Sequence, residues 1–168
     1  EDILKRMRPD DPRTLIALTV EESTEVRTER AIASMKPISG ARYRVMRRIG
    51  KGGMGEVMSA RDEQIGRDVA VKRMRAANPI ERQIARFLRE ACIQGRLEHP
   101  AIVPVHEIGR DDHDLPFFAM KKLTGTSLQE LLAGDRATFP MQRVLRAFTD
   151  VCLAVEFAHV RGVIHRDL

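Results

Sequence analysis

Four glycines fall within the six positions from 50 to 55 of this 168-residue sequence, in the pattern G-x-G-x-x-G followed by x-V. The segments on both sides have the composition of β-strands, with Tyr43, Val45 and Ile49 before the glycines and residues 56–60 after them. A dinucleotide-binding turn of the Rossmann kind needs a helix after its third glycine, so a following strand indicates a hairpin instead. Glycines in a hairpin let backbone N–H groups approach a phosphate, because no Cβ stands in the way.

Three more strand-like segments follow the hairpin. They span residues 68–74, 102–108 and 116–120, with turns at residues 62–66 and 111–114. The first three strands succeed one another through turns and therefore form an antiparallel meander. We therefore expect an α+β fold built on a five-stranded antiparallel sheet.

One helix is expected to pack on this sheet. Asn78-Pro79 opens it and His99-Pro100 ends it. Its apolar residues recur at i, i+3, i+4 and i+7, which places them on one face: Ile84, Phe87, Leu88 and Ala91.

Two further helices are expected near the end of the sequence. Thr126 or Ser127 caps a short one, and Pro140 begins a longer one. The longer helix carries an apolar stripe that comprises Leu145, Phe148, Val151, Cys152, Val155 and Ala158. A stripe of this size left in water favours association, so we expect a homodimer formed through these helices or through residues 1–41.

Lys72 lies in the strand sequence V-A-V-K, on the same face as Ala70 if the strand alternates. An isolated strand lysine is usually solvated, whereas a lysine fifteen residues after Val57 can reach a phosphate held by the hairpin. Glu90 sits beside the inward face of the following helix, and an inward carboxylate needs a cation. Arg89 is adjacent but does not face Glu90 on a helix. We expect an ion pair between Lys72 and Glu90.

These features, with H-R-D-L at residues 165–168, occur in one order that resembles a Hanks-type protein kinase of the bacterial serine/threonine class. The resemblance covers Arg42 to Leu168. It implies a kinase-like N-terminal lobe at residues 42–123 and the first helices of an incomplete C-terminal lobe at 124–168. Residues 1–41 match no pattern and are interpreted as a leader, either a linker or a docking helix.

The resemblance also implies a role for individual positions, with ATP as the cofactor. Lys72 would hold the α- and β-phosphates, Glu90 would orient it, and Asp167 would accept the proton of the substrate hydroxyl. Nucleotide binding is implied for Gly50, Gly52, Gly53 and Gly55 over the phosphates, Val57 and Ala70 against the adenine, Met120 as gatekeeper, and Lys121 and Leu123 in the hinge. Gln94 departs from the family, since kinases often place an apolar residue there, so we expect looser packing of its helix.

The sequence ends one residue after Asp167, whereas kinases take their Mg²⁺ ligands from later residues. We therefore expect no efficient phosphoryl transfer from these 168 residues. ATP binding is expected to be weak or lost, and Mg²⁺ to be present only when supplied with the nucleotide. The alternatives are a non-catalytic binding or scaffold module and a repurposed dimer with weak phosphoester hydrolysis. The protein substrate stays unknown.

Composition limits the other function classes. The chain has 29 Lys plus Arg against 24 Asp plus Glu, a net charge of +5, but the basic residues are scattered and favour solvated helix faces over nucleic-acid binding. No apolar run approaches the ~20 residues that span a bilayer, so we expect no membrane association. Cys92 and Cys152 are interpreted as buried residues in a reducing, cytoplasmic compartment. Residues 111–114 (D-D-H-D) are interpreted as a turn and not as a metal site.

Overall fold

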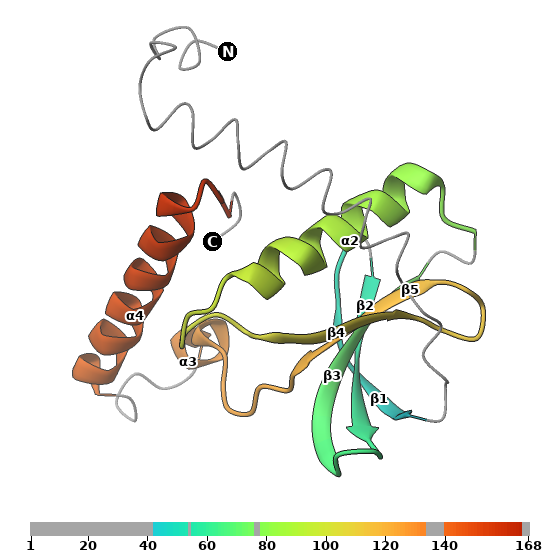
Figure 1. Ribbon diagram of the computed structural model, residues 1–168. Helices are drawn as coiled ribbons and strands as arrows, with labels where there is room; N and C mark the ends of the chain where they lie inside the picture. Colours follow the sequence, from blue (N-terminus) through green and yellow to red (C-terminus); the bar gives the residue numbers. More distant parts are fainter. Residues whose placement is uncertain (1–41, 54, 76–77, 134–139, 166–168) are drawn as a thin grey trace, which may run out of the picture.

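The computed structural model describes residues 42–165, except residues 54, 76–77 and 134–139. The leader and the helix expected within it lie outside the described residues. Figure 1 shows the elements, which follow the order β1 (Tyr43–Lys51), β2 (Gly55–Asp62), β3 (Arg67–Met74), α2 (Glu81–Arg96), β4 (Val105–Arg110), β5 (Pro116–Lys121), α3 (Leu128–Ala133) and α4 (Met141–Val160).

The five strands form one antiparallel sheet in the order β1-β2-β3-β5-β4, which confirms the α+β prediction. The tight turn between β2 and β3 ends at Gly66, whose φ of 77° lies in the left-handed region that glycine tolerates. Its N–H donates to the Asp62 carbonyl over 2.7 Å. After β3 the chain forms α2 and then enters the sheet again at its edge as β4. β5 follows in the chain and lies between β3 and β4.

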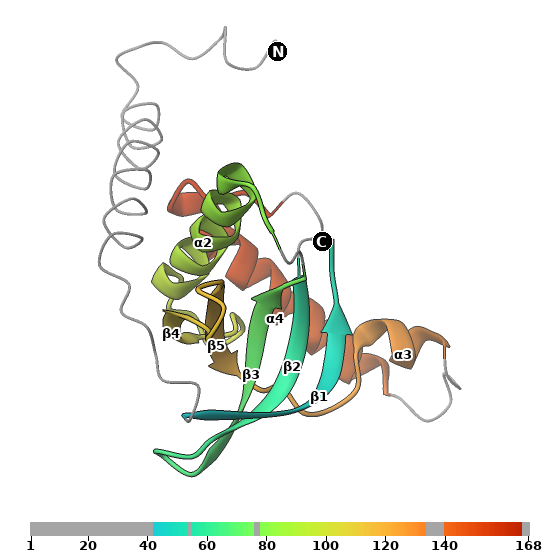
Figure 2. The same cartoon turned by 90° about the vertical axis from the view of Figure 1, so that its right-hand side faces the viewer.

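The sheet has two apolar faces. On one face, α2 packs through Phe87, Leu88 and Ala91 against Met74 and Phe118, with the Phe87 and Phe118 ring centroids 5.2 Å apart. Figures 1 and 2 show α2 lying across this face. The opposite face carries a second buried cluster, made of Tyr43, Ala60, Val69, Val71, Phe117 and Ala119. α2 therefore buries the apolar face that the sequence predicted, through Phe87, Leu88 and Ala91.

Two of the boundaries that differ from the prediction flank the loop between α2 and β4. α2 ends at Arg96 and not at His99-Pro100, because Leu97 leaves helical geometry with φ −91° and ψ 81°. β4 begins at Val105 and not at residue 102, since Pro104 has no N–H with which to extend a strand. The intervening loop closes on His99, whose Nδ1 and carbonyl accept hydrogen bonds from the N–H groups of residues 101 and 102.

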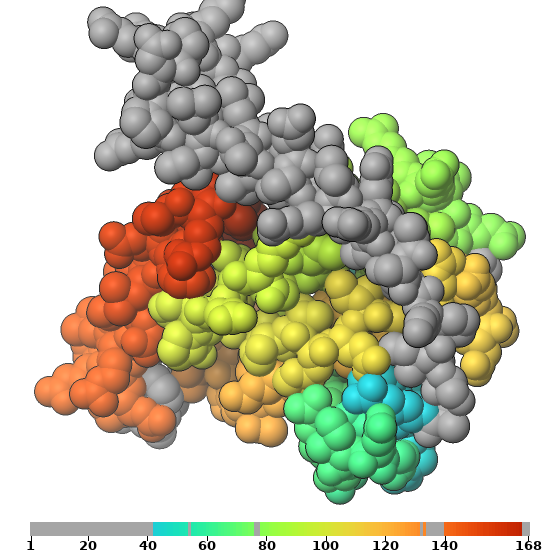
Figure 3. All heavy atoms as spheres, viewed as in Figure 1, coloured from blue at the N-terminus to red at the C-terminus, as the bar shows by residue number. Residues whose placement is uncertain are grey.

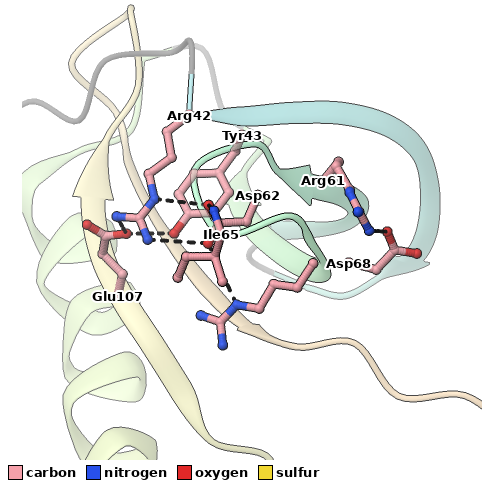
Figure 4. Close-up of polar contacts among 8 residues, drawn as sticks. Arg42, Tyr43, Arg61, Asp62, Ile65, Asp68 and Glu107 are labelled. Carbon is pink, nitrogen blue, oxygen red and sulfur yellow. Dashed lines mark hydrogen bonds and ion pairs between the residues drawn. The ribbon is translucent and has the colours of Figure 1, made fainter.

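A buried ion-pair network joins the start of β1 to β2 and β4 (Figure 4). Arg42 Nε and Nη2 donate to the two carboxylate oxygens of Asp62 over 3.3 Å each, and its Nη1 lies 2.7 Å from Glu107. Tyr43 donates its hydroxyl to Glu107 over 2.6 Å. The Arg42 hydrogen bonds lower the pKa of the fully buried Asp62, whereas burial and the bond to Glu107 raise the pKa of Tyr43.

α4 lies apart from the sheet, at one margin of the molecule (Figure 3). Ala154 is its one buried residue within the described part of the chain. Phe157 contacts the loop after α2, with its ring centroid 5.3 Å from that of His99, and the guanidinium carbon of Arg161 lies 3.5 Å from the centroid of the Phe157 ring. The first part of the apolar stripe faces solvent, as expected, with Leu145, Phe148 and Val151 all exposed, whereas Val155 and Ala158 are half-buried.

The cysteine prediction is wrong in part. Cys92 is half-buried on α2, and Cys152 is exposed on α4. Cys152 belongs to the stripe that the fold leaves uncovered, which explains why an apolar pattern did not bury it. In the described segments, no helix combines the length and the apolarity needed to cross a membrane.

Candidate functional site

Strand register brings the predicted site residues onto one face of the sheet. Gly50 pairs with Val57, Val57 with Lys72, and Lys72 with Phe118. Residues directly opposite each other in an antiparallel sheet share a face. Because Phe118 packs against α2, the glycine hairpin, Val57 and Lys72 lie on the face that α2 covers.

Lys72 and Glu90 meet as predicted. The Lys72 ammonium donates to the Glu90 carboxylate and joins β3 to α2. Its Nζ also lies 5.6 Å from the centroid of the Phe118 ring. The lysine side chain is 18% exposed and the glutamate 37%, so the pair keeps access to solvent. An ammonium held in this position on a strand can bind an anion placed against the same face.

The glycine hairpin is narrow at its base. Gly52 donates its N–H to the Gly55 carbonyl over 2.9 Å, which closes the turn. A Cβ at Gly55 would lie 2.5 Å from the Arg73 carbonyl oxygen, so only glycine fits there without a backbone shift. A Cβ at Gly53 would meet nothing within 4 Å, which leaves the tip open for a bound group. A phosphate fits a hairpin with this open backbone.

An ion pair that the sequence did not reveal anchors the hairpin to β3. Glu56 directly follows the last glycine, and its Oε1 accepts from Nε and Nη2 of Arg73 over 2.8 Å. Arg48 on β1 lies 3.8 Å from the second oxygen of Glu56. At the hairpin tip, Arg75 donates to the Gly53 carbonyl over 3.3 Å. Residues 56 and 73 are opposite each other only in the observed register, which sequence spacing does not specify.

The predicted adenine contacts lie further along the same face. Ala70 is buried and pairs with Met120, which packs against the α2 cluster. Lys121 follows Met120 and donates its N–H to the Pro104 carbonyl over 3.1 Å. Because this N–H already has a hydrogen-bond acceptor, an adenine contact from the Lys121 backbone would have to use its carbonyl oxygen. Leu123 is 65% exposed just beyond the sheet.

Lys122 of the hinge forms an ion pair with the sheet. Lys122 donates to Asp68 over 3.1 Å, and Arg61 donates to the same carboxylate group, also over 3.1 Å. The hydrogen bond from Lys122, with the one from Arg61, lowers the pKa of Asp68. The second hinge lysine thus has a structural partner on β3.

Two other predictions concern polar residues outside this face. Asp167 lies outside the described residues. Residues 111–114 form the predicted turn: Asp111 Oδ1 accepts from the N–H groups of His113 and Leu115, and Asp114 adopts a φ of 60°. Within the described ranges, no three His, Cys, Asp or Glu side chains gather to hold a metal ion.

Comparison with known proteins gives consistent matches. The protein kinase domain family matches residues 43–168. A probable serine/threonine-protein kinase of Streptomyces coelicolor, SCO3848, is 40% identical over 133 residues, which cover 77% of this chain and 20% of that protein. The serine/threonine-protein kinases PknD of Protochlamydia amoebophila and Chlamydia trachomatis serovar D are 36% and 41% identical, over 79% and 76% of this chain. The chain spans 15% of the length of each PknD.

Proposed function

The chain belongs to the protein kinase domain family and is similar to bacterial serine/threonine kinases, and on that premise we propose that its five-stranded lobe binds ATP. Gly50, Gly52, Gly53 and Gly55 would cover the phosphates, and Lys72 would hold two of them. Val57 and Ala70 would contact the adenine, beside Met120 and the hinge. Kinases take ATP together with Mg²⁺, which neutralises the phosphate charge, so Mg²⁺ would arrive with the nucleotide.

The Lys72–Glu90 pair is the observation that carries this proposal. It places an ammonium on the face of the sheet reached by the glycine hairpin, and a carboxylate from α2 fixes its direction. If Lys72 only neutralised the charge of Glu90, no open glycine hairpin would be needed beside it. The open space at Gly53 supports a ligand approached by backbone N–H groups at the hairpin tip.

We propose that the nucleotide serves as a phosphoryl donor to a serine or threonine hydroxyl wherever this lobe works beside a complete large lobe. The similar bacterial proteins are named as serine/threonine-protein kinases, which supports this proposal. Asp167 would accept the hydroxyl proton. The expected lack of transfer by the 168 residues alone stays a prediction, as do the scaffold and phosphoester hydrolysis alternatives.

Nucleotide titration tests the proposal. The chain is titrated with Mg-ATP while its thermal unfolding midpoint is recorded, beside Lys72→Ala and the charge-matched control Arg86→Ala, which removes an exposed cation from α2. We expect ATP to raise the midpoint of the original chain and of the control, and to have little effect on Lys72→Ala. No midpoint shift with millimolar ATP in the original chain would remove the proposal.

A second proposal concerns assembly of the 168-residue chain. Leu145, Phe148 and Val151 form an exposed apolar surface on α4, and apolar patches of this kind mark interaction sites. We propose that this surface pairs with a second copy of the chain. The support from the fold is that these side chains are exposed to solvent. Measurement of the oligomeric state tests the proposal.

A further inference from the structure

Gln94 lies one helical turn after Glu90 and bonds to a different part of the sheet. Its Nε2 donates to the Val103 carbonyl oxygen over 2.9 Å. Residues four apart lie on the same helix face, so both side chains leave α2 on the side that faces the sheet. We expected Gln94 to loosen the packing of this helix, and the structure shows a directed hydrogen bond at that position.

The acceptor is a carbonyl that the sheet does not use. Val103 precedes Pro104, and the β4–β5 ladder begins only with the pair Val105 and Met120. Val103 is half-buried. A buried or half-buried carbonyl without a donor destabilises the fold, so the Gln94 amide satisfies a group that an apolar side chain would leave unpaired.

Apolar side chains of α2 also pack on the sheet. Phe87, Leu88 and Ala91 bury their side chains against Phe118 and Met74. The apolar stripe determines which side of α2 faces the sheet, but apolar burial is non-directional and fixes the exact position of the helix less narrowly than a hydrogen bond does. Hydrogen bonds at two points, one to β3 and one to the segment before β4, restrict that position further.

We propose that Gln94 is a positioning residue for the nucleotide site: by fixing α2 to the Val103 carbonyl, it holds Glu90 against Lys72. The consequence for ATP rests on the proposed function, whereas the mechanical link between residues 94 and 90 does not. Gln94 touches no nucleotide in this account. It acts through the ion pair, and therefore through the lysine that would meet the phosphates.

The test is a double-substitution cycle in the 168-residue chain. Gln94→Leu keeps the side-chain size but removes the donor, and Glu90→Gln removes the charge that pairs with Lys72. The two substitutions are made singly and together, and unfolding by urea gives the free energy of each variant. Gln129→Leu, the same change at an exposed position of α3, is the matched control. ATP and adenosine affinities are measured on all of them.

The proposal expects coupling in both measurements. The unfolding effects of Gln94→Leu and Glu90→Gln should be non-additive, because the first substitution acts partly through the second residue. Gln94→Leu should weaken ATP binding about three- to tenfold, the range for one net hydrogen bond, and leave adenosine binding unchanged. In the Glu90→Gln background the same change should have no further effect on ATP. The control should behave as the original chain.

Additive unfolding effects would overturn the proposal, and so would an ATP loss of equal size in both backgrounds. Equal losses of ATP and adenosine affinity would also overturn it, because they indicate general damage to the lobe. If the original chain binds no ATP, the proposed function fails, and the unfolding cycle alone decides whether Gln94 positions Glu90.

Discussion

Lys72 on β3 and Glu90 on α2 form an ion pair between residues 18 positions apart in the sequence. The pair is the point where the sheet that carries the glycine hairpin meets the helix that packs on it. A displacement of α2 would separate the two charges, so the pair reports the position of the whole helix. A substitution that breaks the pair therefore tests the link between the packing of α2 and the charge on Lys72.

Glu90→Gln should weaken ATP binding while it leaves the fold in place. The glutamate is 37% exposed, so loss of its charge should change the unfolding free energy by no more than about 1 kcal/mol. Lys72 would lose the group that directs it, and ATP affinity should fall about three- to tenfold. Isothermal titration measures the affinity, with adenosine as the ligand that lacks phosphates. A normal ATP affinity in Glu90→Gln would show that Lys72 needs no orienting partner.

Gly55→Ala should destabilise the hairpin, because the new Cβ would lie 2.5 Å from the Arg73 carbonyl oxygen. We expect a loss of about 1–3 kcal/mol in the unfolding free energy, as for other overpacked positions, together with weaker ATP binding. Gly53→Ala is the matched control, since its Cβ would meet nothing within 4 Å. Urea unfolding of both variants checks the difference. Equal stability of the two would contradict the close approach of the strands at residue 55.

The Arg42–Asp62 pair should make stability depend on pH below about 4. Arg42 lowers the pKa of Asp62 from its ordinary value of 3.8, so the folded state favours the ionised carboxylate. Such a group stabilises the fold above its unfolded pKa, and the contribution disappears as the pH falls through the folded pKa. At pH 7, Asp62→Asn should reduce the unfolding free energy by about 2 kcal/mol, less than the roughly 3–5 kcal/mol for a fully buried pair, because Arg42 is partly exposed.

Unfolding measured from pH 7 down to pH 3 checks this prediction. The difference in unfolding free energy between the original chain and Asp62→Asn should begin to narrow below about pH 4, where Asp62 in the unfolded chain begins to take up a proton. Glu63→Gln is a suitable control, because Glu63 pairs with Arg44 at the exposed surface and should change little. A gap that stays constant over the whole range would mean that the Asp62 charge contributes no stability.

The exposed stripe of α4 should make the isolated chain self-associate. Equilibrium sedimentation at micromolar concentration should give a mass above the 19.0 kDa of one chain. Phe148→Glu should restore the single-chain mass, because it places a charge in the middle of the apolar surface. Gln142→Glu adds the same charge at an exposed polar position of α4 and serves as the control. A single-chain mass for the unsubstituted protein would eliminate the proposed pairing.

The sequence predicted the sheet, the packed helix and the Lys72–Glu90 pair because each leaves a local pattern. Strand alternation and helix periodicity are properties of short windows, and an inward carboxylate limits its partners to the few cations within reach. Element ends were less predictable, as the early end of α2 and the late start of β4 show. They depend on the geometry of single residues such as Leu97.

Contacts that depend on register were not accessible to sequence reasoning. Glu56 and Arg73 face each other only because β2 and β3 pair in one of several possible registers, and a shift of one strand by one residue would turn its side chain to the other face. Gln94 was expected to loosen the packing of α2, because the sequence does not show that its side chain has an acceptor. That acceptor is a backbone group, the Val103 carbonyl. Backbone acceptors leave no mark in the sequence, so such bonds emerge only from the fold.

The ratio of ATP to adenosine affinity in the original chain and in Lys72→Ala tests the central claim most directly. Both ligands carry the adenine that the hinge would contact, but only ATP carries the phosphates that Lys72 would hold. We predict that Lys72→Ala reduces ATP affinity about 10- to 100-fold, the range for hydrogen bonds to charged groups, with adenosine affinity unchanged. An unchanged ratio would contradict the assignment of this lobe as an ATP site centred on the Lys72–Glu90 pair.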